Sequence, residues 1–292
     1  MKTEINNSKL YVTIDSLGAE VKGLRDLHGM EYIWPGDDTY WSGSSPVLFP
    51  IVGALRNHTY TYGGKQYTMR QHGFARKMEF KKVSGRTDAV TFCLCANEET
   101  KKQYPFDFAL YISYALHDES MTVKFRVENR GGEAMPFTIG AHPAFRIPME
   151  EGEALTDYRV KFSQKETASC AAVTKDCLID AEVRTPFLCE QDSFVLNHEQ
   201  FSVDALVFDE LKSRSVEMYS TVTGRGVRMD FDGFDYFGIW QPYKEGVPFV
   251  CLEPWTGTGT LTNEGDRLED KRGMKLLPPG DAYEIQYTVT IL

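Results

Sequence analysis

Apolar and polar residues alternate along two stretches of this chain, one near its middle and one at its end. Within residues 121–128 every second residue is apolar, and residues 283–291 repeat the pattern. Successive side chains of a β-strand point to opposite faces, so this alternation predicts strands with one buried face. Further strand candidates lie at residues 10–14, 90–95, 106–116, 205–208, 215–219 and 227–231.

Helical patterning is weak throughout the chain. No stretch sustains the spacing of an amphipathic helix, and strands do not alternate with helices as they do in a parallel sheet. Residues 167–200 have mixed patterning, which predicts short helices or long loops. Residues 62–65 and 129–132 are typical of turns between strands, and no Pro/Ser-rich linker divides the chain. We therefore predict an all-β protein in which residues 1–292 form a single domain, a large antiparallel β-sandwich of two sheets packed face to face.

The charge of the chain excludes several classes of partner. Its formal net charge is -10, its pI is about 5.2 and its basic residues are scattered, so it repels nucleic acids and anionic membranes. No apolar run reaches the length of a membrane span, and the first residues lack the apolar core of a signal peptide. The six cysteines form no tight framework, which fits a reducing compartment. We expect a cytoplasmic monomer or homodimer without nucleic-acid or membrane partners.

Motif patterns exclude other kinds of chemistry. The Gly-rich run at residues 256–260 lacks the Lys-Ser/Thr ending of a phosphate-binding loop, so we predict a loop between strands there. No Gly-x-Ser-x-Gly elbow of a hydrolase is present. The six histidines are not paired at metal-ligand spacing and there is no Cys-x-x-Cys. We therefore expect neither a metal ion nor another cofactor.

Two titratable residues lie in apolar surroundings. Glu253 follows the apolar run 249–252, typical of an interior strand, so its carboxylate must be satisfied by partners or serve a function. His142 taken alone is more simply explained as a core histidine that is hydrogen-bonded through one nitrogen. Burial can move both pKa values toward neutrality, so a fold that joins the two residues can use them as acid and base. Glu253 with Asp209 is a possible pair for glycoside hydrolysis.

A third group of candidate residues lies upstream, in residues 48–57 and 71–76. Arg56 can donate two hydrogen bonds to neighbouring hydroxyls or to a carboxylate. His72, ahead of the flexible Gly73, can donate to a hydroxyl or accept from one. Taken alone, this group is slightly better explained by a surface arginine and a turn histidine.

Together these segments resemble the aldose 1-epimerase (galactose mutarotase) family, and most closely its LacX-like branch. The resemblance extends over essentially the whole chain. No single segment is diagnostic of the family, but the four matching segments, taken together in their order along the chain, are specific for it. The family's large antiparallel β-supersandwich agrees with the alternation described above. The matching segments are residues 49–56, 72–74, 140–143 and 251–255.

The resemblance implies an enzyme that interconverts the α and β anomers of a free aldose, such as glucose or galactose, without a cofactor. In the family a glutamate acts as the base and a histidine as the acid. Those roles fall here on Glu253, as the carboxylate, and His142, as the imidazolium. Arg56 and His72 match the family's sugar-binding arginine and histidine, and Asp209 is the candidate for its hydroxyl-binding aspartate.

Two alternatives stay open within this resemblance. One is a mutarotase of phosphorylated hexose, because a phosphate needs a positive cluster. The other is a non-catalytic sugar-binding or sugar-sensing protein, which has no need for both proton-transfer residues. The order Leu55-Arg56-Asn57 differs from the Asn-Arg order of better-known galactose mutarotases, which leaves the sugar specificity open. Positive charge gathers at Arg56, Arg70, Arg76 and Lys77.

Overall fold

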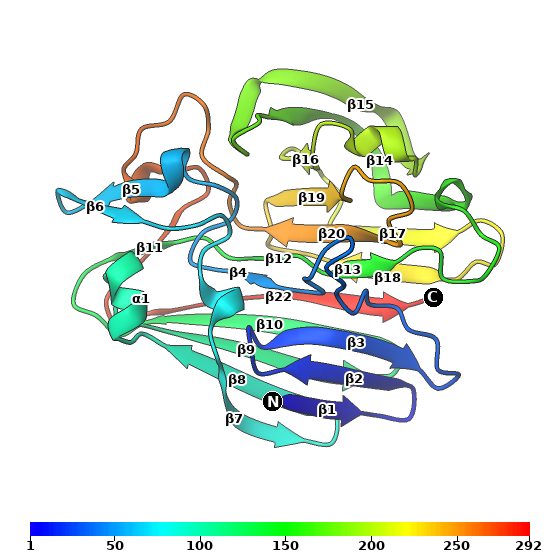
Figure 1. Ribbon diagram of the computed structural model, residues 1–292, viewed down its shortest axis with the longest axis horizontal. Coiled ribbons are helices and arrows are strands. Elements are labelled where there is room, and N and C mark those ends of the chain that lie inside the picture. The colour runs from blue at the N-terminus through cyan, green and yellow to red at the C-terminus, as the bar shows by residue number, and fades with distance from the viewer.

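The computed structural model describes residues 1–292 and is built mainly of β-strands (Figure 1). Its one α-helix is α1 (Glu98–Gln103), and no helix has the length and apolarity to cross a bilayer. The 3₁₀ helices are η1 (Arg56–His58), η2 (Ala75–Lys77), η3 (Leu155–Asp157), η4 (His198–Phe201) and η5 (Leu268–Asp270). The strands are β1 (Lys2–Asn6), β2 (Leu10–Asp15), β3 (Glu20–Asp26), β4 (Val47–Leu48), β5 (Thr59–Tyr62), β6 (Lys65–Thr68), β7 (Lys81–Arg86), β8 (Ala89–Cys95), β9 (Phe108–His117), β10 (Ser120–Asn129), β11 (Met135–Phe137), β12 (Gly140–Ala141), β13 (Ala144–Arg146), β14 (Tyr158–Val173), β15 (Ile179–Val195), β16 (Leu206–Phe208), β17 (Ser215–Ser220), β18 (Gly226–Asp230), β19 (Tyr236–Trp240), β20 (Phe249–Trp255), β21 (Lys275–Leu277) and β22 (Ala282–Ile291).

Most strands join one 15-stranded sheet, in the order β4-β12-β20-β19-β16-β14-β17-β18-β22-β10-β9-β8-β7, with β13 also paired to β20 and β15 to β14. A second sheet holds β1, β2 and β3, and the pairs β5–β6 and β11–β21 form small ribbons. Every pairing between these strands is antiparallel. The prediction of an all-β fold with a large antiparallel β-sandwich is confirmed, although the second layer has three strands rather than being a second large sheet.

The core explains why the alternating segments become strands. Burial alternates residue by residue along β10, whose apolar face pairs with that of β22. One cluster of 65 buried apolar residues extends from Ile5 in the small sheet to Val289 in the last strand. The hydroxyl of Tyr114 in β9 donates to the carbonyl oxygen of Ala19, the residue just before β3, and so connects the two sheets. Burying these side chains supplies the main driving force for the fold.

The expectation of short helices or long loops in residues 167–200 is wrong for most of the segment, and only the 3₁₀ helix η4 at its end agrees with it. The chain instead forms the long strands β14 and β15, which pair as a ribbon at the upper edge of Figure 1. The pairing register shifts at several points between Lys161 and Ala172, so bulges interrupt the alternation. Most of β15 is also partly or fully exposed, which removes the apolar signal that marks a core strand.

The two candidate segments, residues 48–57 and 71–76, cross each other closely at Phe49 and Gly73. The carbonyl oxygen of Phe49 accepts hydrogen bonds from the backbone N–H groups of Phe74 and Ala75, at 3.1 and 3.2 Å. Gly73 has a φ of +69°, and a Cβ at this position would lie 2.2 Å from the Phe49 oxygen. Only glycine fits here, and the crossing fixes the chain on both sides of His72.

Replacing Gly73 by alanine is therefore expected to lower the free energy of unfolding by about 3 kcal/mol or more, measured by urea denaturation. Gly63→Ala is the matched control, because Gly63 also has a positive φ, +56°, but a Cβ added there would have no other atom within 4 Å. It should lose only about 1 kcal/mol. Equal losses in the two variants would show that the contact with Phe49 is not the cause.

Candidate active site

The strand β20 forms the floor of the site. All seven of its residues are buried, and it pairs with β19 on one side and with β12 and β13 on the other. The register joins Gly140 to Trp255 and Ala144 to Cys251, so His142, midway between β12 and β13, lies across from Glu253. Opposed side chains of an antiparallel pair share a face of the sheet. Sheet register therefore brings together two residues that are far apart in sequence.

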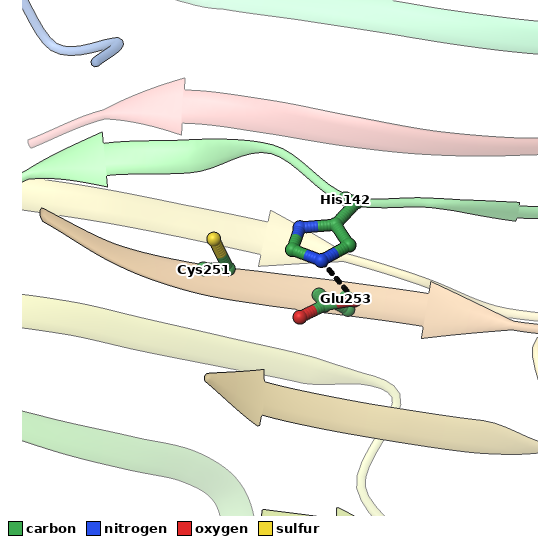
Figure 2. A group of neighbouring side chains, drawn as sticks. All are labelled: His142, Cys251 and Glu253. Carbon is green, nitrogen blue, oxygen red and sulfur yellow. Dashed lines mark ion pairs between the residues drawn. The ribbon is translucent and has the colours of Figure 1, made fainter. Parts of the chain in front are cut away.

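The side chains of His142 and Glu253 are in contact. Nε2 of His142 lies 3.3 Å from Oε2 of Glu253, and the side chains are only 8% and 2% exposed (Figure 2). The two atoms are close but not aligned as a hydrogen bond, and both Glu253 Oε2 and His142 Nδ1 lack a hydrogen-bond partner. Folded proteins leave few buried polar atoms unpaired, because each costs free energy. Both atoms therefore remain available to a ligand.

Burial sets the charge of this pair. It lowers the pKa of His142 to about 3, and the positive charge of Arg76 contributes to the shift. Burial also raises the pKa of Glu253 well above its usual value, and the negative charge of Asp204 adds to this. Both groups therefore favour their neutral forms in the free protein. These directions favour a neutral carboxyl group beside a neutral imidazole, whereas the resemblance implies a carboxylate–imidazolium pair.

Aromatic rings hold the imidazole of His142 in place. The ring of Trp41 stacks on it with centroids 4.8 Å apart, while Trp240 meets it edge-on at 5.4 Å. His72 packs edge-on against it at 5.7 Å. These contacts exclude water from one side of the pair and restrict the ring to one orientation.

His142 and Glu253 border a cavity of about 500 Å³, a size typical of small-molecule sites. His72 lines the same cavity. Its Nδ1 accepts a hydrogen bond from the backbone N–H of Gly53 at 3.1 Å, and burial lowers its pKa well below the usual value. The ring is therefore neutral, with its proton on Nε2 as a hydrogen-bond donor.

Two further charged residues line the cavity, and the sequence did not single them out for sugar binding. Arg76 donates one hydrogen bond, from Nη2 to the carbonyl oxygen of Gln71 at 3.0 Å, while its buried Nε has no hydrogen-bond partner. A guanidinium has five N–H donors, so most of them stay free for a ligand. Asp204 accepts from the backbone N–H of Ala205 at 2.7 Å, and burial raises the pKa of its carboxyl group.

Arg56 lies outside the cavity lining, so the structure does not place it with the other candidate residues. Its Nη1 donates to the carbonyl oxygen of Glu264 and to the Asp266 carboxylate, at 2.9 and 3.2 Å. Its Nη2 donates to the carbonyl oxygens of Leu261 and Thr262, at 3.2 and 2.9 Å. The guanidinium holds the chain after β20 in this structure, and the sugar-binding role expected for Arg56 stays a prediction.

Asp209 also lies outside the cavity lining. Its carboxylate is 2% exposed and forms ion pairs with Arg184, at 2.5 Å, and Arg272, at 2.9 Å. Both oxygens are occupied, and the two arginines hold its pKa below the usual value despite burial. The structure thus places Asp209 between two arginines, and its expected roles in binding a hydroxyl and in pairing with Glu253 for glycoside hydrolysis stay predictions. The aspartate that lines the cavity is Asp204, which precedes β16, whereas Asp209 follows it. The sequence signal that could have found Asp204 is a carboxylate next to a buried strand.

An all-β sandwich whose cavity holds a buried, unpartnered histidine–glutamate pair defines a protein suited to acid–base chemistry on a small ligand. The sequence model of the family "Aldose 1-epimerase" matches residues 1–274, and the chain belongs to this family. Protein LacX (plasmid) of Lactococcus lactis subsp. lactis is 40% identical over 299 residues, covering 100% of both chains.

Solved structures agree with this assignment. A galactose mutarotase related enzyme from Lactobacillus acidophilus superposes with a TM-score of 0.96 at 32% identity, over 100% of this chain and 97% of that one. A galactose mutarotase-like protein from Lactobacillus casei has a TM-score of 0.94 at 28% identity, over 100% of both chains. The fold is therefore that of the galactose mutarotase-like proteins.

Proposed function

We propose that this protein is an aldose 1-epimerase that interconverts the α and β anomers of a neutral aldose. The observation that carries the proposal is the contact between His142 and Glu253, 3.3 Å apart at a cavity wall, in which Glu253 Oε2 and His142 Nδ1 have no hydrogen-bond partner. Membership of the family supports the same activity. A protein that only binds or senses sugars gains nothing from two unpaired proton-transfer groups, so the pair favours an enzyme over that alternative.

The pair can open and close the sugar ring with its single proton. Transfer of that proton from Glu253 to His142 creates a carboxylate and an imidazolium. Glu253 then takes the proton of the C1 hydroxyl while His142 protonates the ring oxygen, and the C1–O5 bond breaks to give the free aldehyde. After rotation about C1–C2, closure runs with the roles exchanged, so each turnover restores the proton count. Each positioned transfer contributes about 10²–10⁴-fold.

The remaining cavity residues suit the hydroxyls of a neutral sugar. Arg76 and the Nε2–H of His72 are donors, and Asp204 is an acceptor when ionised. Held at several hydroxyls, the sugar stays in place while C1 turns. A sugar that lacks one of these hydroxyls leaves a buried polar group unpaired and is expected to react more slowly.

The charges of the cavity favour a neutral aldose over a phosphorylated one. Of the four basic residues considered for phosphate, only Arg76 lines the cavity, while Arg70 and Lys77 are exposed. Two carboxyl groups, those of Asp204 and Glu253, line it as well. A phosphate dianion is best held by several cations at once, so this lining suits it poorly.

Polarimetry tests the proposed function. Fresh solutions of α-glucose, α-galactose and α-glucose 6-phosphate are followed to equilibrium with and without the protein. We expect acceleration for at least one neutral aldose and a smaller effect, or none, for the phosphate ester. Saturable sugar binding without any acceleration would support the non-catalytic sugar-binding protein. Faster reaction of the phosphate ester than of the neutral aldoses would support a mutarotase of phosphorylated hexose.

The pH dependence of kcat/KM is expected to have its acid limb far below the range of an ordinary histidine. Activity needs one proton on the pair, so a second proton stops it. Because burial lowers the pKa of His142 to about 3 from 6.5, that second proton binds only near pH 3. The raised pKa of Glu253 moves loss of the single proton, the alkaline limb, to higher pH.

Polarimetric rates corrected for spontaneous mutarotation measure this profile, and circular dichroism at each pH verifies that the protein is folded. An acid limb centred near pH 6.5 in the folded protein would contradict the charge state assigned to the pair.

We also propose that the protein works in the reducing cytoplasm, as the sequence leads us to expect. All six cysteines are free thiols, which supports this compartment. Whether the protein is a monomer or a homodimer stays a prediction, which sedimentation or light scattering decides.

A further inference from the structure

A buried thiol lies beside the proton-transfer pair and has no part in the mechanism above. Cys251 stands two residues before Glu253 on β20, so both side chains are on the same face of the strand (Figure 2). One ligand atom each from His142, Cys251 and Glu253 lie within 4.8 Å of one another. All three residues are buried. This cluster could not be predicted from the spacing of the residues in the sequence, because only the sheet register brings His142 next to Cys251 and Glu253.

The cluster has nearly the dimensions of a tetrahedral metal site. With bonds of about 2.0–2.1 Å to nitrogen, 2.0–2.2 Å to oxygen and 2.3 Å to sulfur, two ligand atoms of a zinc ion lie about 3.3–3.6 Å apart. The His142–Glu253 distance is 3.3 Å, within this range. The Cys251 sulfur is at most 4.8 Å from one imidazole nitrogen of His142 and one carboxylate oxygen of Glu253, so binding requires a movement of about an ångström.

The charges and unpaired atoms of the cluster also suit a divalent cation. Oε2 of Glu253 is buried and has no hydrogen-bond partner, so it is an available ligand atom. A neutral imidazole, a thiolate and a carboxylate together carry two negative charges, which one divalent ion neutralises. Of the charged groups acting on the pair, Arg76 opposes a cation and Asp204 favours one, so their effects offset each other.

We propose that His142, Cys251 and Glu253 form a binding site for a thiophilic divalent cation such as Zn²⁺ or Cd²⁺, and that its occupancy inhibits the enzyme. The cation coordinates Nε2, Sγ and a carboxylate oxygen, displaces the thiol proton and any carboxyl proton, and leaves its fourth position to water or a sugar hydroxyl. Inhibition follows because both proton-transfer groups are then ligands. The inhibition rests on the proposed function, whereas the binding does not.

The set of ligands predicts selectivity. Thiolate and imidazole prefer Zn²⁺ and Cd²⁺, whereas Mg²⁺ requires oxygen ligands and keeps much of its water. Mg²⁺ is therefore the control cation. A second pair of thiols, Cys93 and Cys95 on β8, has its sulfur atoms 3.7 Å apart and can also bind thiophilic ions. The test is best made in a Cys93→Ser/Cys95→Ser protein.

The Cys93→Ser/Cys95→Ser protein is first freed of metal with EDTA and dialysed. Cd²⁺ is then added stepwise to it in two parallel assays. Ultraviolet absorption follows the thiolate-to-cadmium charge-transfer band, and polarimetry follows mutarotation. We expect one equivalent of Cd²⁺ to develop the band and to abolish the catalysed rate, EDTA to restore it, and Mg²⁺ to do neither. Cys251→Ser should weaken Cd²⁺ binding by at least about tenfold and remove the band, with inhibition expressed relative to that variant's own rate in EDTA.

The outcomes separate the two proposals. A metal-free protein that does not accelerate mutarotation refutes the proposed function, and the absorption titration still decides whether the site exists. An active protein with no band, or with the same band and affinity after Cys251→Ser, refutes the metal site. If Cys251→Ser does not fold, Cys251→Ala replaces it. If neither variant folds, the criterion is that the Cys93→Ser/Cys95→Ser protein binds one equivalent of Cd²⁺ and loses its catalysed rate.

Discussion

Glu253→Gln and His142→Asn are each expected to lower the catalysed rate of mutarotation by about 10²–10⁴-fold, because each removes one of the two positioned proton transfers. Both substitutions keep the approximate size of the side chain but abolish its role as an acid or base. Polarimetry with the best aldose of the panel measures the loss. The double variant should be little slower than either single variant, because residues that act as a unit are not additive.

The stability of these variants provides the control. The pair is buried without full hydrogen bonding, so neutral replacements should leave the free energy of unfolding unchanged or raise it. Thermal unfolding by circular dichroism measures this quantity. Loss of activity together with retained stability assigns the residues to the reaction. Wild-type rates in both folded variants would falsify the proposed site.

Arg76→Ala is expected to lower kcat/KM by about 10–100-fold, because a charged hydrogen-bond donor at the cavity contributes roughly 1.5–3 kcal/mol. Arg56→Ala is its matched partner and should behave in the opposite way. Its guanidinium holds three carbonyl oxygens and the Asp266 carboxylate after β20, so its loss should lower the free energy of unfolding by about 1–3 kcal/mol and leave kcat/KM near that of the wild type.

Steady-state polarimetry and urea denaturation of both variants measure these effects. If Arg56→Ala lost kcat/KM while Arg76→Ala lost only stability, the sequence-based assignment of Arg56 to the sugar would stand. The same comparison extends to aspartates: Asp204→Asn should affect kcat/KM, and Asp209→Asn should affect stability, because Asp209 is enclosed by two arginines.

The strands that could be predicted are those with a regular buried face. The alternation in β10 and β22 is a local property, since neighbouring side chains on a strand face opposite sides. The ribbon β14–β15 escaped prediction because its bulges and exposure break that alternation. The strand β16 was expected correctly, but the cavity aspartate precedes it as Asp204 and does not follow it as Asp209.

The sequence by itself determined the all-β class and the two unusual residues, His142 and Glu253, because apolar alternation and a carboxylate beside an apolar strand are visible locally. Only the tertiary structure decided which charged residues face the cavity. Arg56 and Arg76 are both arginines in candidate segments. Distant backbone carbonyls occupy Arg56, whereas Arg76 donates one hydrogen bond, to Gln71, and lines the cavity. The cluster with Cys251 likewise depends on sheet register. Such partners are set by long-range packing, which no local pattern records.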